Sequence, residues 1–299
     1  MGTFESNGIG VLGNTILLSS YASMACAGHL LRPTHLIVAN MAVANFLVLL
    51  FKGIPQMIFT WGVVYVLGDA ACKLVYYIHR MARGLSLCTT CLLSVFQALT
   101  ISPAGGGWTR LKDVARRKVR FSCLLCWVLS NLLMNLFIPL KIQARPRGLN
   151  STSMQHYGLC SSETPKTAAA KYAVLLTFPD VAFMALMAAA SAYMVLLLHR
   201  HHQRVRHVHS HSGTHRLSPE TKATHTILLL AGTFIFFYFT NSVLTISDIY
   251  FSQSHLWLQH APTFVAACYP TLSPLILMLR DPRAPTLFLS GEKGIASHR

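Results

Sequence analysis

The sequence contains seven apolar runs, and each is long enough to cross a lipid bilayer. About 20 apolar residues in a helix span the hydrocarbon layer, and a spanning helix satisfies its own backbone hydrogen bonds. The sequence therefore predicts an all-α membrane protein. We expect a seven-transmembrane helix bundle in residues 1–280 and a short tail in 281–299. The predicted spans cover residues 8–28, 36–59, 72–101, 120–140, 171–198, 224–250 and 261–279.

The composition agrees with a lipid-exposed chain. Hydrophobic residues make up 53% of the sequence and charged residues only 11%, whereas soluble domains carry about 25% charged residues. The formal net charge is +16, but the Lys and Arg residues gather in short stretches between the apolar runs. A nucleic-acid-binding protein spreads such residues over a soluble face. The lipid bilayer is therefore the predicted surrounding, and no nucleic-acid partner is expected.

The distribution of charge also predicts the orientation. If the N-terminus is extracellular, 16 of the 25 Lys and Arg residues lie in cytoplasmic segments and 5 in extracellular ones. Cytoplasmic segments of membrane proteins carry this excess, so the C-terminus is predicted to be cytoplasmic. The single N-x-[ST] sequon, Asn150-Ser151-Thr152, then falls outside. Asn150 is the candidate glycosylation site.

The predicted cytoplasmic segments carry two basic clusters and a histidine-rich stretch. The first cluster suits anionic lipid, an acidic protein partner or plain solvation, and these interpretations stay open. The histidine-rich stretch, 199–215, is interpreted as a mobile basic loop rather than a metal site. The basic residues singled out are Arg110, Lys112, Arg116, Arg117 and Lys118 in the first cluster, and Arg204 and Arg206 in the second.

Two arginines lie inside the third predicted span. Arg80 and Arg83 share one helix face, with Tyr76 and Tyr77 nearer the outside. A charge at this depth costs roughly 2.5–3.5 kcal/mol on insertion scales, so both should face the bundle interior. They could form the floor of a cavity that attracts polar or anionic ligands. They could also form an internal ion pair with Asp180 or Asp248, and both interpretations can hold together.

Four cysteines form two C-x-x-C pairs, Cys88–Cys91 and Cys123–Cys126. A zinc site needs thiolate anions, which a position deep in the bilayer disfavours. Packing between helices, where small side chains let backbones approach, is the favoured interpretation. The alternative is a membrane thiol oxidoreductase that uses Cys88 and Cys91. No catalytic motif such as G-x-S-x-G or H-E-x-x-H is present, and neither enzyme activity, a metal nor a cofactor is predicted.

Two further cysteines, Cys72 and Cys160, fall at or beyond the predicted outer ends of spans. In that oxidising compartment a disulfide between them would persist and would tie the second outer loop over the bundle. Two unpaired thiols are the other possibility.

Several strings identify the chain by resemblance. The longest runs from Cys72 to Pro103, "CKLVYYIHRMARGLSLCTTCLLSVFQALTISP", and others are "LIVANMAVANF", "FPDVAF", "SPETKATHTILLL" and "YPTLSPLILM". With seven spans, they resemble the vomeronasal type 1 receptors, the pheromone-receptor family of G-protein-coupled receptors. The chain departs from rhodopsin-like receptors, since "TISP" stands in place of D-R-Y and "YPTLSP" in place of N-P-x-x-Y. A bitter-taste receptor is the nearest alternative, but it lacks the "HRMARG" and "TTCLLSVFQ" strings.

The resemblance implies a multi-pass plasma-membrane chemoreceptor of vomeronasal sensory neurons. It would bind a small pheromone-like molecule and activate a heterotrimeric G protein of the inhibitory Gi/Go class through its basic inner segments. It further implies a Cys72–Cys160 disulfide and a glycan on Asn150. The ligand-binding candidates, which the resemblance itself leaves open, are Tyr76, Tyr77, Arg80, Arg83 and Asp180.

Overall fold

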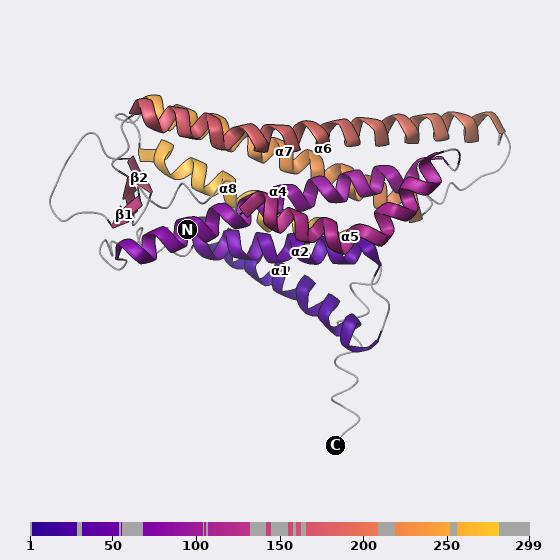
Figure 1. The fold of residues 1–299 in the computed structure, drawn as a ribbon, viewed down its shortest axis with the longest axis horizontal. Helices are drawn as coiled ribbons and strands as arrows, with labels where there is room; N and C mark the ends of the chain where they lie inside the picture. The colour runs from indigo at the N-terminus through magenta and orange to yellow at the C-terminus, as the bar shows by residue number, and fades with distance from the viewer. Residues whose placement is uncertain are drawn as a thin grey trace, which may run out of the picture.

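The chain forms a bundle of seven long α-helices within the part that the structure describes (Figure 1). The structure is a computed structural model, and it describes residues 2–28, 32–53, 55, 68–103, 105, 107–131, 142–144, 155–157, 160–162, 166–208, 219–251 and 256–280. The helices are α1 (Gly2–Cys26), α2 (Pro33–Val48), α4 (Asp69–Ile101), α5 (Gly107–Asn131), α6 (Lys166–Val208), α7 (Pro219–Phe251) and α8 (Leu256–Arg280).

Six of these helices are long and apolar enough to cross a membrane: α1, α2 with the short segment that follows it, α4, α6, α7 and α8. The predicted seven-helix architecture is confirmed. α5 falls outside this group of six because its first half carries six Lys and Arg residues between Arg110 and Arg120. Residues 132–140, the rest of the predicted fourth span, lie outside the described residues.

Helix ends differ from the predicted spans where a helix continues past the apolar run. α5 begins at Gly107 rather than at residue 120, and α6 ends at Val208 rather than at 198. Arg, Lys, Gln and Ala favour helix, so a helix need not stop where hydropathy falls. The interpretation of 199–215 as a loop is therefore wrong for its first ten residues, which continue α6.

The second span changes its winding before it ends. Leu49–Gly53 form a π-helix, η1, directly after α2. Such wide turns occur as insertions in α-helices, often near functional sites. Gly53 packs here against α1, where an added methyl group would lie 2.5 Å from the Asn7 side-chain amide. A larger residue at this position would require the Asn7 side chain to shift.

A small antiparallel sheet lies between α5 and α6 in the sequence. Its strands are β1 (Ile142–Ala144), β2 (Gln155–Tyr157) and β3 (Cys160–Ser162), in the order β1-β3-β2. In this register Cys160 lies opposite both Ala144 and Tyr157. The sheet lies at one end of the bundle and β1 contacts α4 (Figure 1). The three-residue strands were not predicted from the sequence, because they are too short to show an alternating pattern.

α4 is the central helix, in contact with α2, α5, α6 and α7. Its second half is buried almost all round, from Leu85 to Ala98. A helix without an exposed face belongs in the middle of a bundle, where neighbours cover every side. Side chains of α4 are therefore the ones that can reach several helices at once.

A buried asparagine joins α1 to α8. The Asn14 amide donates to the Pro270 carbonyl at 2.9 Å and to the Gly10 carbonyl at 2.7 Å. Pro274 has no backbone N–H, so the carbonyl four residues earlier, that of Pro270, lacks its helical partner. Asn14 supplies the missing donor. In a membrane, neighbouring helices satisfy the backbone groups that a proline leaves unpaired.

Candidate ligand-binding site

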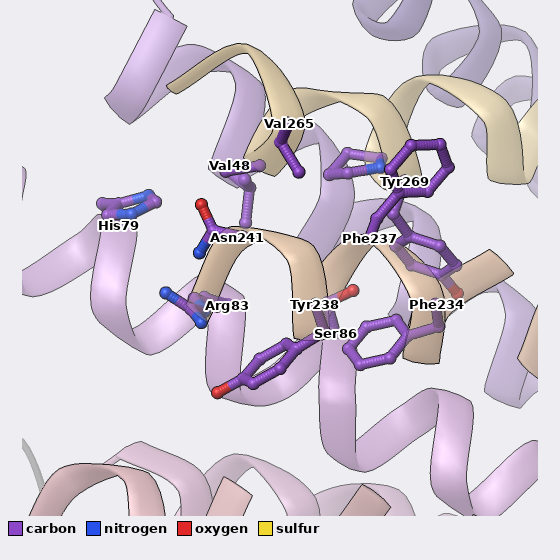
Figure 2. Close-up of a pocket in the computed structure, with 12 residues that line it drawn as sticks. Val48, His79, Arg83, Ser86, Phe234, Phe237, Tyr238, Asn241, Val265 and Tyr269 are labelled. Atoms are coloured by element: carbon purple, nitrogen blue, oxygen red, sulfur yellow. The ribbon is translucent and has the colours of Figure 1, made fainter. Parts of the chain in front are cut away.

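The middle of the bundle holds a pocket with one basic side. α4 directs His79, Arg83 and Ser86 to it, since positions i, i+4 and i+7 lie on one helix face. α7 supplies aromatic rings and α8 supplies Tyr269. Figure 2 shows His79 and Arg83 on one side and the rings of Phe234 and Tyr269 on the other. The full lining is Val48, His79, Arg83, Ser86, Phe234, Phe237, Tyr238, Asn241, Val265, Ala266, Tyr269 and Pro270.

The pocket is narrow. Its cavity volume is about 40 Å³, enough for a few water molecules. The walls are chiefly aromatic and aliphatic, with polar groups at few points, as in sites for small organic ligands. A larger ligand would have to displace aromatic rings.

Arg83 is held against an aromatic ring. Its guanidinium carbon lies 4.5 Å from the centroid of the Tyr238 ring, which is a cation–π contact between α4 and α7. The Tyr238 hydroxyl donates a hydrogen bond to Asp180 of α6. The same carboxylate oxygen of Asp180 lies 3.8 Å from Arg80 Nη2. Four side chains thus join α4, α6 and α7 beside the pocket.

The predicted site residues separate into three groups. Arg83 lines the pocket, whereas Arg80 and Asp180 form an ion pair beside it. Tyr76 and Tyr77 are half-buried on α4, outside the pocket lining. The predicted internal ion pair is therefore found for Arg80, and Arg83 lies in the lining of a cavity. The Asp248 side chain lies outside the described residues.

Sequence reasoning missed His79 and Tyr238. His79 could have been found, because it precedes Arg83 by one helical turn on the same face. Its Nδ1 is buried and has no hydrogen-bond partner among the described residues. Tyr238 is one of several aromatic residues in "FIFFYFT". Nothing in that string indicates which ring meets Arg83.

Next to the pocket, a group of buried polar side chains, here called the polar core, joins α2, α4 and α8. Ser86 donates to the Asn45 side-chain oxygen at 2.6 Å, and the Asn45 amide donates to Ser273 at 2.8 Å. The Thr90 and Tyr269 hydroxyls lie 2.8 Å apart. Because Ser86 and Tyr269 also line the pocket, a group bound there would touch members of this core.

The two C-x-x-C pairs meet between α4 and α5. Cys88 and Cys126 have their sulfur atoms 2.7 Å apart, and Cys91 and Cys123 are buried nearby in the core. All four are reduced thiols. Among the described residues no group of three or more His, Cys, Asp or Glu side chains could hold a metal ion. The arrangement is that of a helix–helix contact.

The basic residues at the opposite end of the bundle from the sheet have different surroundings. Lys112 Nζ lies 2.5 Å from the carbonyl oxygen of Ser102, the residue directly after α4. Arg110, Arg116, Arg117 and Lys118 are exposed on α5. The side chains of Arg204 and Arg206 lie outside the described residues.

Cys72 lies buried near the start of α4 and is disulfide-bonded. Cys160 begins β3, although its side chain is outside the described part of the chain. Asn150 and the tail at 281–299 are also outside it.

The long apolar helices of the bundle define a multi-pass helical membrane protein. The chain belongs to the vomeronasal organ pheromone receptor family, whose sequence model matches residues 1–290. This is a family of G-protein-coupled receptors in the plasma membrane, not of enzymes. The resemblance seen in the sequence is confirmed, and the bitter-receptor and oxidoreductase alternatives are not retained.

Individual receptors show the same relationship. Human vomeronasal type-1 receptor 4 is 42% identical over 275 residues, which cover 92% of this chain and 91% of that receptor. Human vomeronasal type-1 receptor 1 is 40% identical over 274 residues, covering 92% and 77%. Zebrafish olfactory receptor class A-like protein 1 is 32% identical over 278 residues, covering 91% and 85%.

Proposed function

We propose that this receptor binds a small pheromone-like molecule in the pocket beside Arg83 and activates a Gi/Go-class G protein. The observation that carries the proposal is the pairing of one basic side with aromatic walls in the centre of the bundle. This arrangement suits an amphiphile whose apolar body lies on the rings and whose polar or anionic group meets Arg83 and His79. His79 Nδ1, buried without a partner among the described residues, would gain a hydrogen bond from such a group.

Binding would change activity through the contacts that the ligand alters. A ligand shifts a receptor between two states only by binding one of them more tightly. A ligand group at Arg83 would compete with the Tyr238 ring for the guanidinium. This competition would loosen the link from α4 to α7 and, through Asp180, to α6.

We propose that the sheet end of the bundle and the N-terminus are extracellular. The excess of Lys and Arg in the opposite segments supports this orientation. In this orientation residues 1–280 form the receptor domain and 281–299 a cytoplasmic tail. Among the inner basic residues, Arg116, Lys118, Arg204 and Arg206 would face the G protein, whereas Lys112 contacts the end of α4. Expression in sensory neurons of the vomeronasal organ is the setting that the family suggests.

Two outer features complete the proposal: a Cys72–Cys160 disulfide and a glycan on Asn150. The pairing is supported because Cys72 is disulfide-bonded and β3, which begins with Cys160, pairs with β1 beside α4. Cys72→Ser, Cys160→Ser and the double variant should lower surface expression equally. Asn150→Gln should remove a glycosidase-sensitive mass shift. A persistent shift would contradict the glycan assignment, and an additive loss in the double cysteine variant would contradict the pairing.

The ligand pocket is tested in cells that carry the receptor and a Gi/Go reporter. Wild type is screened against pairs of volatile and steroid-like compounds that differ only in an acidic group. Arg83→Ala should reduce the response to the acidic member by about tenfold more than to the neutral member, the effect of losing one charge-assisted hydrogen bond. Arg200→Ala, an exposed arginine near the far end of α6, is the charge-matched control. Equal losses for both compounds would contradict the role of Arg83.

A further inference from the structure

α5 has one packed face, set by three buried residues. Val119, Cys123 and Cys126 are buried against the bundle. Trp127 donates its indole N–H to the Asn40 side chain of α2 at 3.0 Å. These contacts fix the rotation of the helix about its axis, so the direction of every other side chain on α5 follows from helical geometry.

The opposite face of α5 carries one line of exposed side chains, here called the stripe. The stripe includes arginines in its first half and only apolar residues in its second half. Its residues recur at spacings of three and four, which places them in one line on the helix. Arg110 and Arg117 are exposed on this stripe, and beyond them Phe121 is 62% exposed, Leu124 59% and Val128 39%. In order along α5 the stripe is Arg110, Val114, Arg117, Phe121, Leu124 and Val128.

In a membrane protein such an exposed apolar face contacts lipid tails, which locates the membrane surface on α5. Arg117 precedes Phe121 by four residues, about 6 Å along the helix axis. The Arg117 guanidinium therefore lies at the level of the lipid headgroups and faces lipid rather than the centre of the bundle. Arg110 lies two turns further out on the same line.

We propose that Arg110 and Arg117 bind the phosphate headgroup of an anionic phospholipid. Charge complementarity and the continuity of the stripe with the lipid-exposed apolar face favour a lipid over a protein. Arginine suits this role because its planar guanidinium makes paired hydrogen bonds to phosphate. The proposal rests on the proposed function in one respect: the orientation that puts this end of α5 in the cytoplasmic leaflet, where anionic lipids reside.

The assignment changes the interpretation of the basic cluster in α5. Lys112 is turned toward the bundle and contacts the end of α4. Arg116 and Arg120 lie toward the α2 side, about a quarter to a third of a turn from the stripe. Arg110 and Arg117, which the sequence suggested as G-protein contacts, are thereby assigned to lipid. The rotation of α5 about its axis thus directs members of this basic cluster to different sides of the helix.

The test uses the purified full-length receptor in nanodiscs of phosphatidylcholine containing a few per cent of a fluorescent phosphatidylserine or phosphatidylinositol 4,5-bisphosphate. Lipid retained by the receptor is measured after exchange into neutral lipid. Wild type should retain the anionic lipids over labelled phosphatidylcholine. Arg110→Gln/Arg117→Gln should lose about fivefold for each arginine removed. Arg116→Gln/Arg120→Gln, which removes equal charge from the same helix, should retain the wild-type level.

Two results would overturn the proposal. Equal losses in both double variants would show a general charge effect rather than a site. Unchanged lipid retention in Arg110→Gln/Arg117→Gln, with loss of capture of a purified Gi heterotrimer, would show that the stripe serves a protein. The thermal midpoint of each variant reports whether it is folded. The lipid assay contains neither ligand nor G protein, so its failure leaves the proposed receptor function to its own test.

Discussion

The guanidinium of Arg83 lies over the ring of Tyr238, 4.5 Å from its centroid, while the hydroxyl of the same tyrosine binds Asp180. One residue of α7 therefore holds a cation of α4 through its ring and an anion of α6 through its hydroxyl. The two contacts can be removed separately, because Phe keeps the ring and loses only the hydroxyl.

Tyr238→Phe should leave Arg83 in place and release Asp180, whereas Tyr238→Leu should release both. A cation–π contact away from water stabilises by about 1–2 kcal/mol. We therefore expect Tyr238→Leu to lower the thermal midpoint of the purified receptor, and the response to acidic ligands, more than Tyr238→Phe does. Equal effects in both assays would show that the hydroxyl alone matters.

Arg80→Ala should destabilise the receptor by leaving Asp180 with one partner fewer. The side chains of this ion pair are 20% and 13% exposed. The expected loss lies between the ~1 kcal/mol of a surface pair and the ~3 kcal/mol that breaking a buried pair costs at the low end. Adding Asp180→Asn to Arg80→Ala should recover part of the surface expression. A double variant as poor as the sum of the singles would mean that the two residues do not interact.

Asn14→Leu should leave the Pro270 carbonyl without a donor. A buried unpaired carbonyl costs about 1–3 kcal/mol, which a thermal-shift assay of the solubilised receptor would detect. Pro274→Ala restores a backbone N–H to the Pro270 carbonyl, so Asn14→Leu should be less harmful in a Pro274→Ala background. If the two changes simply add, the Asn14 contact does not compensate for the proline.

Gly10→Ala should be destabilising. Its methyl group would lie 2.6 Å from both Leu49 Cδ1 and Thr271 Oγ1, a separation that forces α1 away from η1 and α8. Gly8→Ala is the matched control, because no atom lies within 4 Å of its added methyl group and alanine favours helix by about 0.5–1 kcal/mol. Surface expression should fall for Gly10→Ala alone, and a similar fall for Gly8→Ala would contradict the steric explanation.

Cys88→Ala/Cys126→Ala should keep ligand-evoked signalling, with a stability loss of about 1 kcal/mol from the missing sulfur contact. Maleimide should label neither thiol in the folded wild-type receptor, since both are buried. Signalling that disappears in the double variant at normal surface expression would show that these thiols do more than pack.

The number of long helices and the family could both be predicted from the sequence alone. Hydropathy can be calculated at each position of the chain. The thickness of the bilayer sets how long an apolar run must be to form a spanning helix. The sequence also indicated that Arg80 and Arg83 face the interior, because lipid excludes them. The helix ends were harder to predict from the sequence. α5 begins 13 residues before its predicted span, because the helix-forming Lys and Arg residues lie outside the apolar run.

The partner of each of these residues became known only from the arrangement of the helices in space. Arg80 pairs with Asp180, Arg83 lies on Tyr238, and Asn14 compensates for Pro274 more than two hundred residues away. Such pairings depend on how each helix is rotated and on which helices are neighbours. A pattern along the sequence gives neither the rotation of a helix nor the identity of its neighbours. The same rotation turns Lys112 toward α4 and leaves Arg117 exposed on the opposite face, although the two lie five residues apart on one helix.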